Sequence, residues 1–265
     1  MKQLAGTLSL VSALVLLCGC GGGGTPPLPP GPPPLFLKIS GNWQFSTTSI
    51  AGMTPLTIAG SINLAGTEVS SAVHVDGSTC FDQPTAIVLT GTLTGSEISL
   101  TSASVGGQVI TFTGSITDTV FTGTYAITGG CAGGDHGNVT GTKIPPITGQ
   151  LSGTFTTSAN QSFNVVAQLS QGSASSDGSF GITGTVTFSS SCLTAGTITS
   201  GTFPSGSFIV GKSVTLEIVT VNGTVAFHGT ANPATGNISG DYAISGSACD
   251  QTGTAVLVAS SPWDY

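Results

Sequence analysis

The chain has 265 residues, only 6% of them charged, and a formal net charge of −7 with no arginine. Nucleic-acid binding needs clustered Lys and Arg to neutralise phosphates, so this composition excludes it. It also excludes arginine clamps on phosphate or carboxylate groups. A hydrophobic content of 38% argues against a disordered chain.

The first residues have the pattern of an export signal. Met1–Gln3 is a short positive segment, and the apolar stretch Leu4–Leu17 is shorter than the roughly 20 residues of a spanning helix. The stretch ends in Leu17-Cys18-Gly19-Cys20, which resembles the lipobox of bacterial lipoproteins. The resemblance implies a signal peptide over residues 1–19, with diacylglycerol on the Cys20 sulfur and a palmitate-type acyl chain on its amine. An ordinary secretory signal is the alternative.

Residues 20–35 form a Gly/Pro-rich linker in this interpretation. Gly21–Pro34 reads GGGGTPPLPPGPPP, in which glycines give flexibility and prolines give an extended spacer. Lipoproteins kept at the inner membrane carry Asp after the lipidated cysteine. Gly21 therefore favours the outer membrane or the cell surface.

The remaining chain reads as two copies of one unit, residues 36–145 and 146–265. Ser40–Phe45 resembles Ser152–Phe155 near the two starts. Phe121–Ile127 resembles Ile238–Ile244 near the two ends, and a cysteine follows each of these segments. Such recurrence indicates an internal repeat.

Both halves alternate apolar and polar residues. Ile110, Phe112 and Ile116 share one face of a stretch whose other face carries threonine and serine, the pattern of strands with one buried face. The expected strands start near residues 39, 56, 68, 84, 96, 108, 119 and 137, and near 150, 162, 179, 196, 213, 223, 236 and 252. The fold class is all-β: two tandem antiparallel meander β-barrels, or β-sandwiches, of about eight strands each.

Two disulfides are expected in an exported protein, Cys80–Cys131 and Cys192–Cys249. In a meander, the turns after strands three and seven lie at the same end, which is where these cysteines fall. In a round barrel those turns lie across the mouth from each other, so the loops must fold inward, or the barrel must be flattened. Metal binding by the cysteines is the alternative interpretation, but the sequence lacks the CxxC spacing typical of metal sites.

Two short motifs resemble those of known barrels. Gly41-Asn42-Trp43 resembles the Gly-x-Trp of lipocalin-type barrels, and Gly123-Thr124-Tyr125 resembles motifs of avidin-like barrels. These resemblances imply a barrel with a ligand cavity, although the basic residue that lipocalins set against the Trp has no arginine candidate. Alternation predicts that Trp43, Phe155, Tyr125 and Tyr242 are core residues.

No catalytic constellation stands out. Asp135 and His136 lie in a glycine-rich turn, and we interpret them as solvated turn residues rather than as a catalytic pair. Alternation places His74 and His228 on the solvent face. Asp76, Asp82 and Asp135 near the first disulfide could form a weak calcium site, although the second half keeps only Asp250 near its own cysteines. We expect no metal, no cofactor and no catalytic residue.

The sequence favours a non-enzymatic cell-envelope lipoprotein, lipid-anchored to the membrane, with two disulfide-closed domains in a binding or structural role towards protein or glycan. The alternatives are a lipocalin-like carrier of a small apolar ligand and an enzyme acting on envelope polymers. A membrane barrel is disfavoured by short strands and 6% aromatic content. Thr-rich strands with little charge also suggest self-association along exposed sheet edges.

Overall fold

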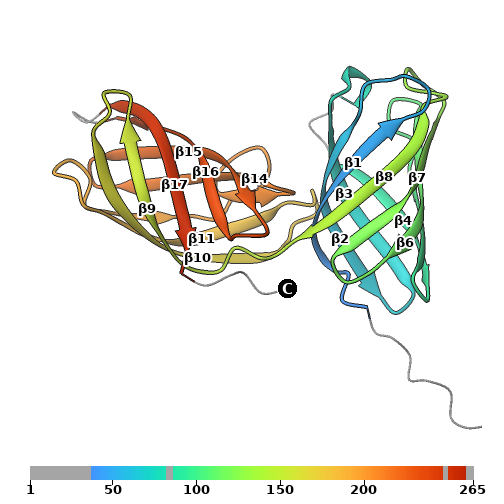
Figure 1. Cartoon of the computed structure of the whole chain (residues 1–265), viewed down its shortest axis with the longest axis horizontal. Helices are drawn as coiled ribbons and strands as arrows, with labels where there is room; N and C mark the ends of the chain where they lie inside the picture. Colours follow the sequence, from blue (N-terminus) through green and yellow to red (C-terminus); the bar gives the residue numbers. More distant parts are fainter. Residues whose placement is uncertain (1–36, 82–85, 247–249, 261–265) are drawn as a thin grey trace, which may run out of the picture. The chain divides into compact units, whose positions relative to one another are not determined.

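The computed structural model describes residues 37–81, 86–246 and 250–260. Over these residues the protein is all-β, and its strands form two closed antiparallel barrels in tandem (Figure 1). This confirms the predicted fold class and decides between barrel and sandwich. The predicted signal peptide, Cys20, the linker, Asp82 and Cys249 lie outside the described residues.

The first barrel is a simple meander in which each strand pairs with the next. Its strands are β1 Gly41–Ser49, β2 Thr57–Ala65, β3 Glu68–Asp76, β4 Ile87–Thr94, β5 Glu97–Ser102, β6 Val109–Ile116, β7 Val120–Thr128 and β8 His136–Ile144. The sheet closes by antiparallel pairing of β1 with β8, in which Phe45 lies opposite Gly141. Closure leaves no free edge in this sheet, so the predicted route of edge-to-edge association is wrong here.

The second barrel has the same meander with one extra short strand. Its strands are β9 Gly149–Thr157, β10 Ser162–Ala174, β11 Phe180–Phe188, β12 Ala195–Ile198, β13 Phe208–Val210, β14 Ser213–Thr220, β15 Gly223–Asn232, β16 Asn237–Ser245 and β17 Gln251–Ala259. β9 pairs with β17, and β10 pairs with β11, which closes the ring. The short β12 ends early, and β13 pairs with β11 and β14 next to it. The sequence did not predict β13.

The alternation of apolar and polar residues along each strand decides which side chains face the interior of the barrel. Trp43, Phe155, Tyr125 and Tyr242 are each at most 2% exposed, which confirms them as core residues. Glycines make room for the large rings: a methyl group at Gly141 would lie 2.5 Å from the ring of Phe45. The small residue and the ring opposite it therefore fill the interior together.

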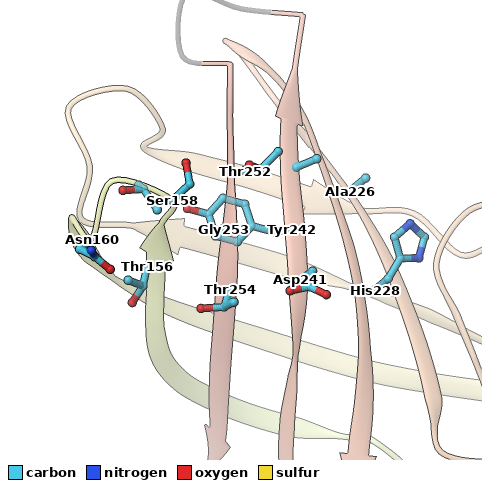
Figure 2. Close-up of a pocket in the computed structure, with 12 residues that line it drawn as sticks. Thr156, Ser158, Asn160, Ala226, His228, Asp241, Tyr242, Thr252, Gly253 and Thr254 are labelled. Atoms are coloured by element: carbon cyan, nitrogen blue, oxygen red, sulfur yellow. The ribbon is translucent and has the colours of Figure 1, made fainter.

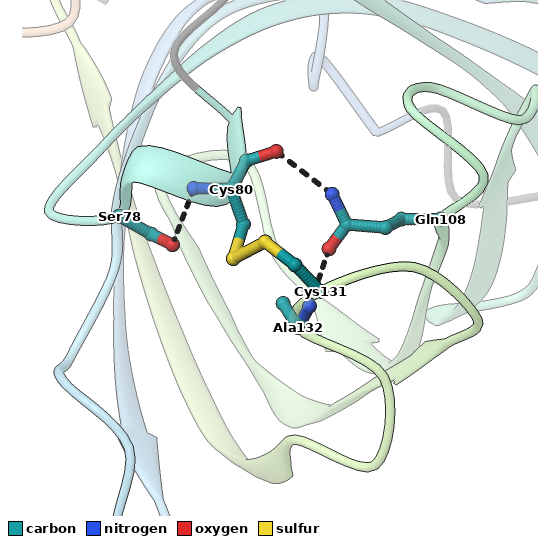
Figure 3. The surroundings of a disulfide bond; sticks show 5 residues. All are labelled: Ser78, Cys80, Gln108, Cys131 and Ala132. Carbon is teal, nitrogen blue, oxygen red and sulfur yellow. Dashed lines mark hydrogen bonds between the residues drawn. A yellow bond between two sulfur atoms is a disulfide. The ribbon is translucent and has the colours of Figure 1, made fainter.

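A loop folds inward at one end of the first barrel, which is one of the two arrangements that the cysteine positions left open. The 3-10 helix Thr79–Phe81 carries Cys80, which forms the disulfide with Cys131 at a Cα–Cα distance of 5.7 Å (Figure 3). Phe81, the last residue of this short helix, is 3% exposed and packs in the core of the first barrel.

Gln108 ties the two sides of this loop cluster together. Its Nε2 donates to the Cys80 carbonyl at 2.8 Å, and its Oε1 accepts from the Ala132 amide at 2.9 Å (Figure 3). The side chain is only 1% exposed. Nothing in the local sequence marked this residue, because its partners come from two loops that only the fold brings together.

The two barrels match when they are aligned on their paired tyrosines. In the first barrel Tyr125 lies opposite Gly137, which lies opposite Ser49. In the second, Tyr242 lies opposite Gly253, which lies opposite Thr157.

Thr47 stands two residues before Ser49, and Phe155 stands two residues before Thr157, so these two residues occupy equivalent positions. By the same count Trp43 is equivalent to Leu151. The two Gly-x-aromatic segments that look alike in sequence therefore lie at different levels of the two barrels.

Candidate functional site

A row of polar side chains crosses the outer face of the second barrel. His228 lies opposite Asp241, Asp241 opposite Thr254, and Thr254 opposite Thr156, each on the next strand of the sheet. Their inward neighbours Phe227, Tyr242 and Phe155 are buried, so alternation turns the four polar side chains outward. Opposed residues in a sheet have Cβ atoms about 5 Å apart, close enough to engage one small molecule together.

This row belongs to a hollow of about 640 Å³ (Figure 2). The hollow extends from His228 to the turn that joins β9 and β10, where Ser158 and Asn160 line it. Asn160 has a left-handed backbone with φ of 60°, a conformation that Asn tolerates better than most residues. The lining residues are Thr156, Thr157, Ser158, Asn160, Ala226, His228, Asp241, Tyr242, Ala243, Thr252, Gly253 and Thr254.

Tyr242 is among the lining residues, but its side chain lies on the inner face of the sheet. The side chain is 2% exposed, and its ring packs against Phe155 with 4.6 Å between centroids. Its hydroxyl is buried and has no hydrogen-bond partner among the described residues. Burial raises the pKa of the Tyr242 phenol above its ordinary value of 10.0, since the phenolate would lose its hydration.

The equivalent tyrosine of the first barrel has a full set of partners. The Tyr125 hydroxyl donates to Oδ2 of Asp135 at 3.0 Å, and the Ser49 hydroxyl donates to Oδ1 at 2.6 Å. Burial and, next, the bond to Asp135 raise the pKa of Tyr125. Gln251 of the second barrel is equivalent to Asp135 of the first. Gln251 lies opposite Ile244, and the backbone carbonyl of Asp135 accepts a hydrogen bond from the amide of Ile127, the residue equivalent to Ile244.

The hollow therefore combines one carboxylate, one imidazole and several hydroxyls, while the Tyr242 phenol is buried on the inner face of the sheet. Thr156 and Ser162 bond each other through their hydroxyls at 3.0 Å, and Thr215 bonds Nδ1 of His228 at 3.4 Å. The described residues contain no group of three His, Cys, Asp or Glu side chains that could hold a metal ion.

The side chains of Asp135 and His136, which the sequence predicts to be solvated turn residues rather than a catalytic pair, have different surroundings. His136 is exposed, and its Nδ1 lies 2.9 Å from the Gly134 carbonyl oxygen, as expected for a turn residue. Asp135 is 4% exposed and bonds Tyr125 and Ser49, so its interpretation as a solvated residue is wrong. The backbone turn buries its carboxylate at the mouth of the barrel.

The predictions for the other candidate residues are partly confirmed and partly wrong. His228 is on the solvent face as predicted, whereas His74 is half-buried, with Nε2 2.9 Å from the Asp177 carbonyl oxygen and its ring against Phe203. For the calcium hypothesis, Asp76 is exposed and Asp135 already has hydrogen-bond partners.

Cys80–Cys131 is present as a disulfide, which indicates an extracytoplasmic location. The pairing Cys192–Cys249 stays a prediction because Cys249 lies outside the described residues. The same holds for lipidation of Cys20.

Sequence reasoning missed the hollow and Tyr242's unpaired hydroxyl. The one available signal was the difference between Gly123-Thr124-Tyr125 and Gly240-Asp241-Tyr242, where a carboxylate replaces a threonine. That replacement places a charge on an outer face that is otherwise rich in threonine.

Searches of protein-family models, of curated proteins and of solved structures found no match to this chain. Within the described ranges, no helix has the length and apolar character needed to cross a membrane.

Proposed function

We propose that this protein is a cell-envelope lipoprotein, anchored through Cys20, whose two barrels serve a non-catalytic binding role through their outer surfaces. The observation that carries the proposal is the contrast between the interior of the first barrel and the outer face of the second. The first barrel keeps an internal cavity of only about 10 Å³, among Phe45, Phe112 and Phe121. The hollow around Asp241 is far larger.

A filled barrel argues against the carrier alternative. Pockets for small apolar ligands have volumes of about 300–1,000 Å³, whereas the interior of the first barrel has room for about one water molecule. Phe45 stacks on Trp43 and Phe112 there, with ring centroids 5.8 and 6.1 Å apart. The aromatic rings occupy the volume that a lipocalin-like ligand would need.

The enzyme alternative has lost its one candidate pair. A general base and its partner must reach the same reacting atoms. Asp135 is buried with two hydroxyl partners, while His136 is exposed and bonds the backbone of its own turn.

The linker and the anchor fit a displayed binding module. Cys20 and the Gly/Pro-rich residues up to 35 would hold the barrels away from the membrane, and more than one acyl chain gives stable attachment. The Cys80–Cys131 disulfide fits the same oxidising compartment.

Metabolic labelling with alkyne palmitate tests the anchor. We expect label on the wild type and none on Cys20→Ala. Equal labelling of the two proteins would contradict anchoring at Cys20, and a Cys18→Ala variant that keeps its label is the matched control.

Native mass spectrometry of the exported chain tests the binding mode. We expect the native and denatured masses to agree, apart from bound water and salt. A co-purified apolar molecule in the native spectrum alone would contradict filled barrels and favour the carrier.

A further inference from the structure

We propose that the outer face of strands β1 to β3 is a docking surface for the second barrel, and that this contact holds the two barrels together as one body. The surface carries Asn42, Gln44 and His74, and its partner is the backbone of two turns of the second barrel. Both barrels belong to the same compact unit of the chain, although residues 145–148 are the whole connection between β8 and β9. The inference goes beyond the proposed binding role, because it concerns how the two domains are held.

The burial of Asn42 supplies the first argument. Trp43 and Phe45 face the barrel interior, so alternation along β1 turns Asn42 and Gln44 to the outside. An outward amide on a bare barrel would be exposed, yet Asn42 is 2% exposed. Its Nδ2 donates to the carbonyl oxygen of Gly211 at 2.8 Å, and its Oδ1 accepts from the Gly211 amide at 2.7 Å. The side chain thus satisfies both backbone groups of a buried residue in the other barrel.

Further contacts hold the barrels at other points. The Lys212 amide donates to Oε1 of Gln44 at 3.1 Å. On β3, Nε2 of His74 lies 2.9 Å from the carbonyl oxygen of Asp177, and its ring packs against Phe203 with 4.2 Å between centroids. A single hydrogen bond would act as a pivot, whereas contacts from two strands to separate turns oppose rotation of one barrel against the other.

Two glycines let the turns come this close. Gly178, in the β10–β11 turn, has a φ of 83°, and Gly211, in the β13–β14 turn, has a φ of 54°. A methyl group on Gly178 would overlap the Ala72 carbonyl oxygen, and one on Gly211 would overlap Oε1 of Gln44. Glycine therefore serves at both places for the left-handed backbone and for the close approach to the first barrel.

The docking turns belong to the parts in which the second barrel departs from the first. β10 has 13 residues against 9 in its counterpart β2, and it leads into the turn that carries Asp177. The short strand β13, which the first barrel lacks, leads into the turn that carries Gly211 and Lys212. The two copies of the unit thus differ at the segments that contact the other copy, as expected if these additions serve docking.

Hydrogen exchange of the full chain in detergent micelles tests the dock. Turn amides exchange quickly when they are exposed, but the Gly211 and Lys212 amides donate to side chains of the first barrel. We expect both amides to be protected in the wild type. Asn42→Ala should accelerate exchange at Lys212 by roughly tenfold or more, the effect of losing a hydrogen bond. Because Lys212 donates to Gln44 and not to Asn42, this acceleration reports separation of the barrels. Asn138→Ala, at an exposed position of β8, is the matched control and should leave exchange unchanged.

A second variant acts from the other turn. Gly178→Ala should push the β10–β11 turn off Ala72 and accelerate exchange at Gly211 and Lys212, whose own acceptors stay in place. Gly66→Ala is the matched control, because Gly66 has a similar φ of 67° and a methyl group there meets no described atom within 4 Å. Exchange of the strand amides in the same experiment shows that each barrel stays folded.

Two results would overturn the proposal: unprotected Gly211 and Lys212 amides in the wild type, or full protection of Lys212 in both Asn42→Ala and Gly178→Ala. The first would mean that the barrels move independently, and the second that these contacts do not hold them. Acceleration at Lys212 in either variant, with both controls unchanged, supports it.

Discussion

The Tyr125 hydroxyl donates to the buried Asp135 carboxylate at 3.0 Å, whereas the equivalent Tyr242 has no partner among the described residues. One phenol thus bonds a buried carboxylate, and the other is buried without a partner. The same residue type at the same place in the repeat has different surroundings because Gln251 stands where the first barrel has Asp135.

Removing the two hydroxyls should have different effects on stability. Tyr125→Phe leaves Asp135 with Ser49 as its side-chain partner, and we expect a loss of about 1–3 kcal/mol in the free energy of unfolding. Tyr242→Phe removes an unpaired buried hydroxyl and should be neutral or stabilising. Urea denaturation of both variants measures this, and an equal loss in the two would show that Tyr242 has a partner in solution.

Stability should fall at alkaline pH because both phenols have raised pKa values in the folded state. Above pH 10 the unfolded chain loses these protons before the folded chain does, so stability decreases as pH rises through the folded-state pKa values.

Lys143 has a lowered pKa, caused chiefly by its burial, and therefore acts in the opposite direction. Thermal melts between pH 8 and pH 11, on both sides of the ordinary tyrosine pKa of about 10, should show a smaller decline for Tyr242→Phe. An identical decline would contradict the assignment.

Gln108→Ala should loosen the loops at the mouth of the first barrel. The substitution removes the bonds to the Cys80 carbonyl and the Ala132 amide, and we expect a loss of about 2–4 kcal/mol in the free energy of unfolding. Thiol trapping under mild reductant should also detect faster opening of Cys80–Cys131. Wild-type stability and trapping rate in this variant would contradict a bridging role.

The disulfide itself should contribute strongly to stability. Cys80 and Cys131 are separated by 51 residues, and the chain-entropy model gives about 4 kcal/mol for a loop of this length. Urea denaturation of the Cys80→Ala, Cys131→Ala double variant measures the loss. A change below about 1 kcal/mol would mean that the inward loop is held by packing alone.

Gly141→Ala should be destabilising by about 1–3 kcal/mol, because the added methyl group would overlap the Phe45 ring. Gly172→Ala is the matched control: its nearest contact is an ordinary 3.6 Å to the Gly181 carbonyl oxygen. Similar melting of the two variants would show that the first barrel can make room for the methyl group.

The sequence by itself determined the strands, the repeat and the inward-facing set. Alternation of residues such as Ile110 and Phe112 is a local property, so it needs no knowledge of the partner strand. The common end of Cys80 and Cys131 followed in the same way, from counting strands in a meander.

Only the tertiary structure decided which residues meet across strands. Three features depend on the register between strands: the closure of β1 on β8 and of β10 on β11, the bridge made by Gln108, and the row from His228 to Thr156. Alternation does not fix the register between distant strands. The unpaired hydroxyl of Tyr242 has the same origin, since a hydrogen bond depends on ångström-scale placement of a neighbour such as Gln251, and the sequence order alone contains no such distance.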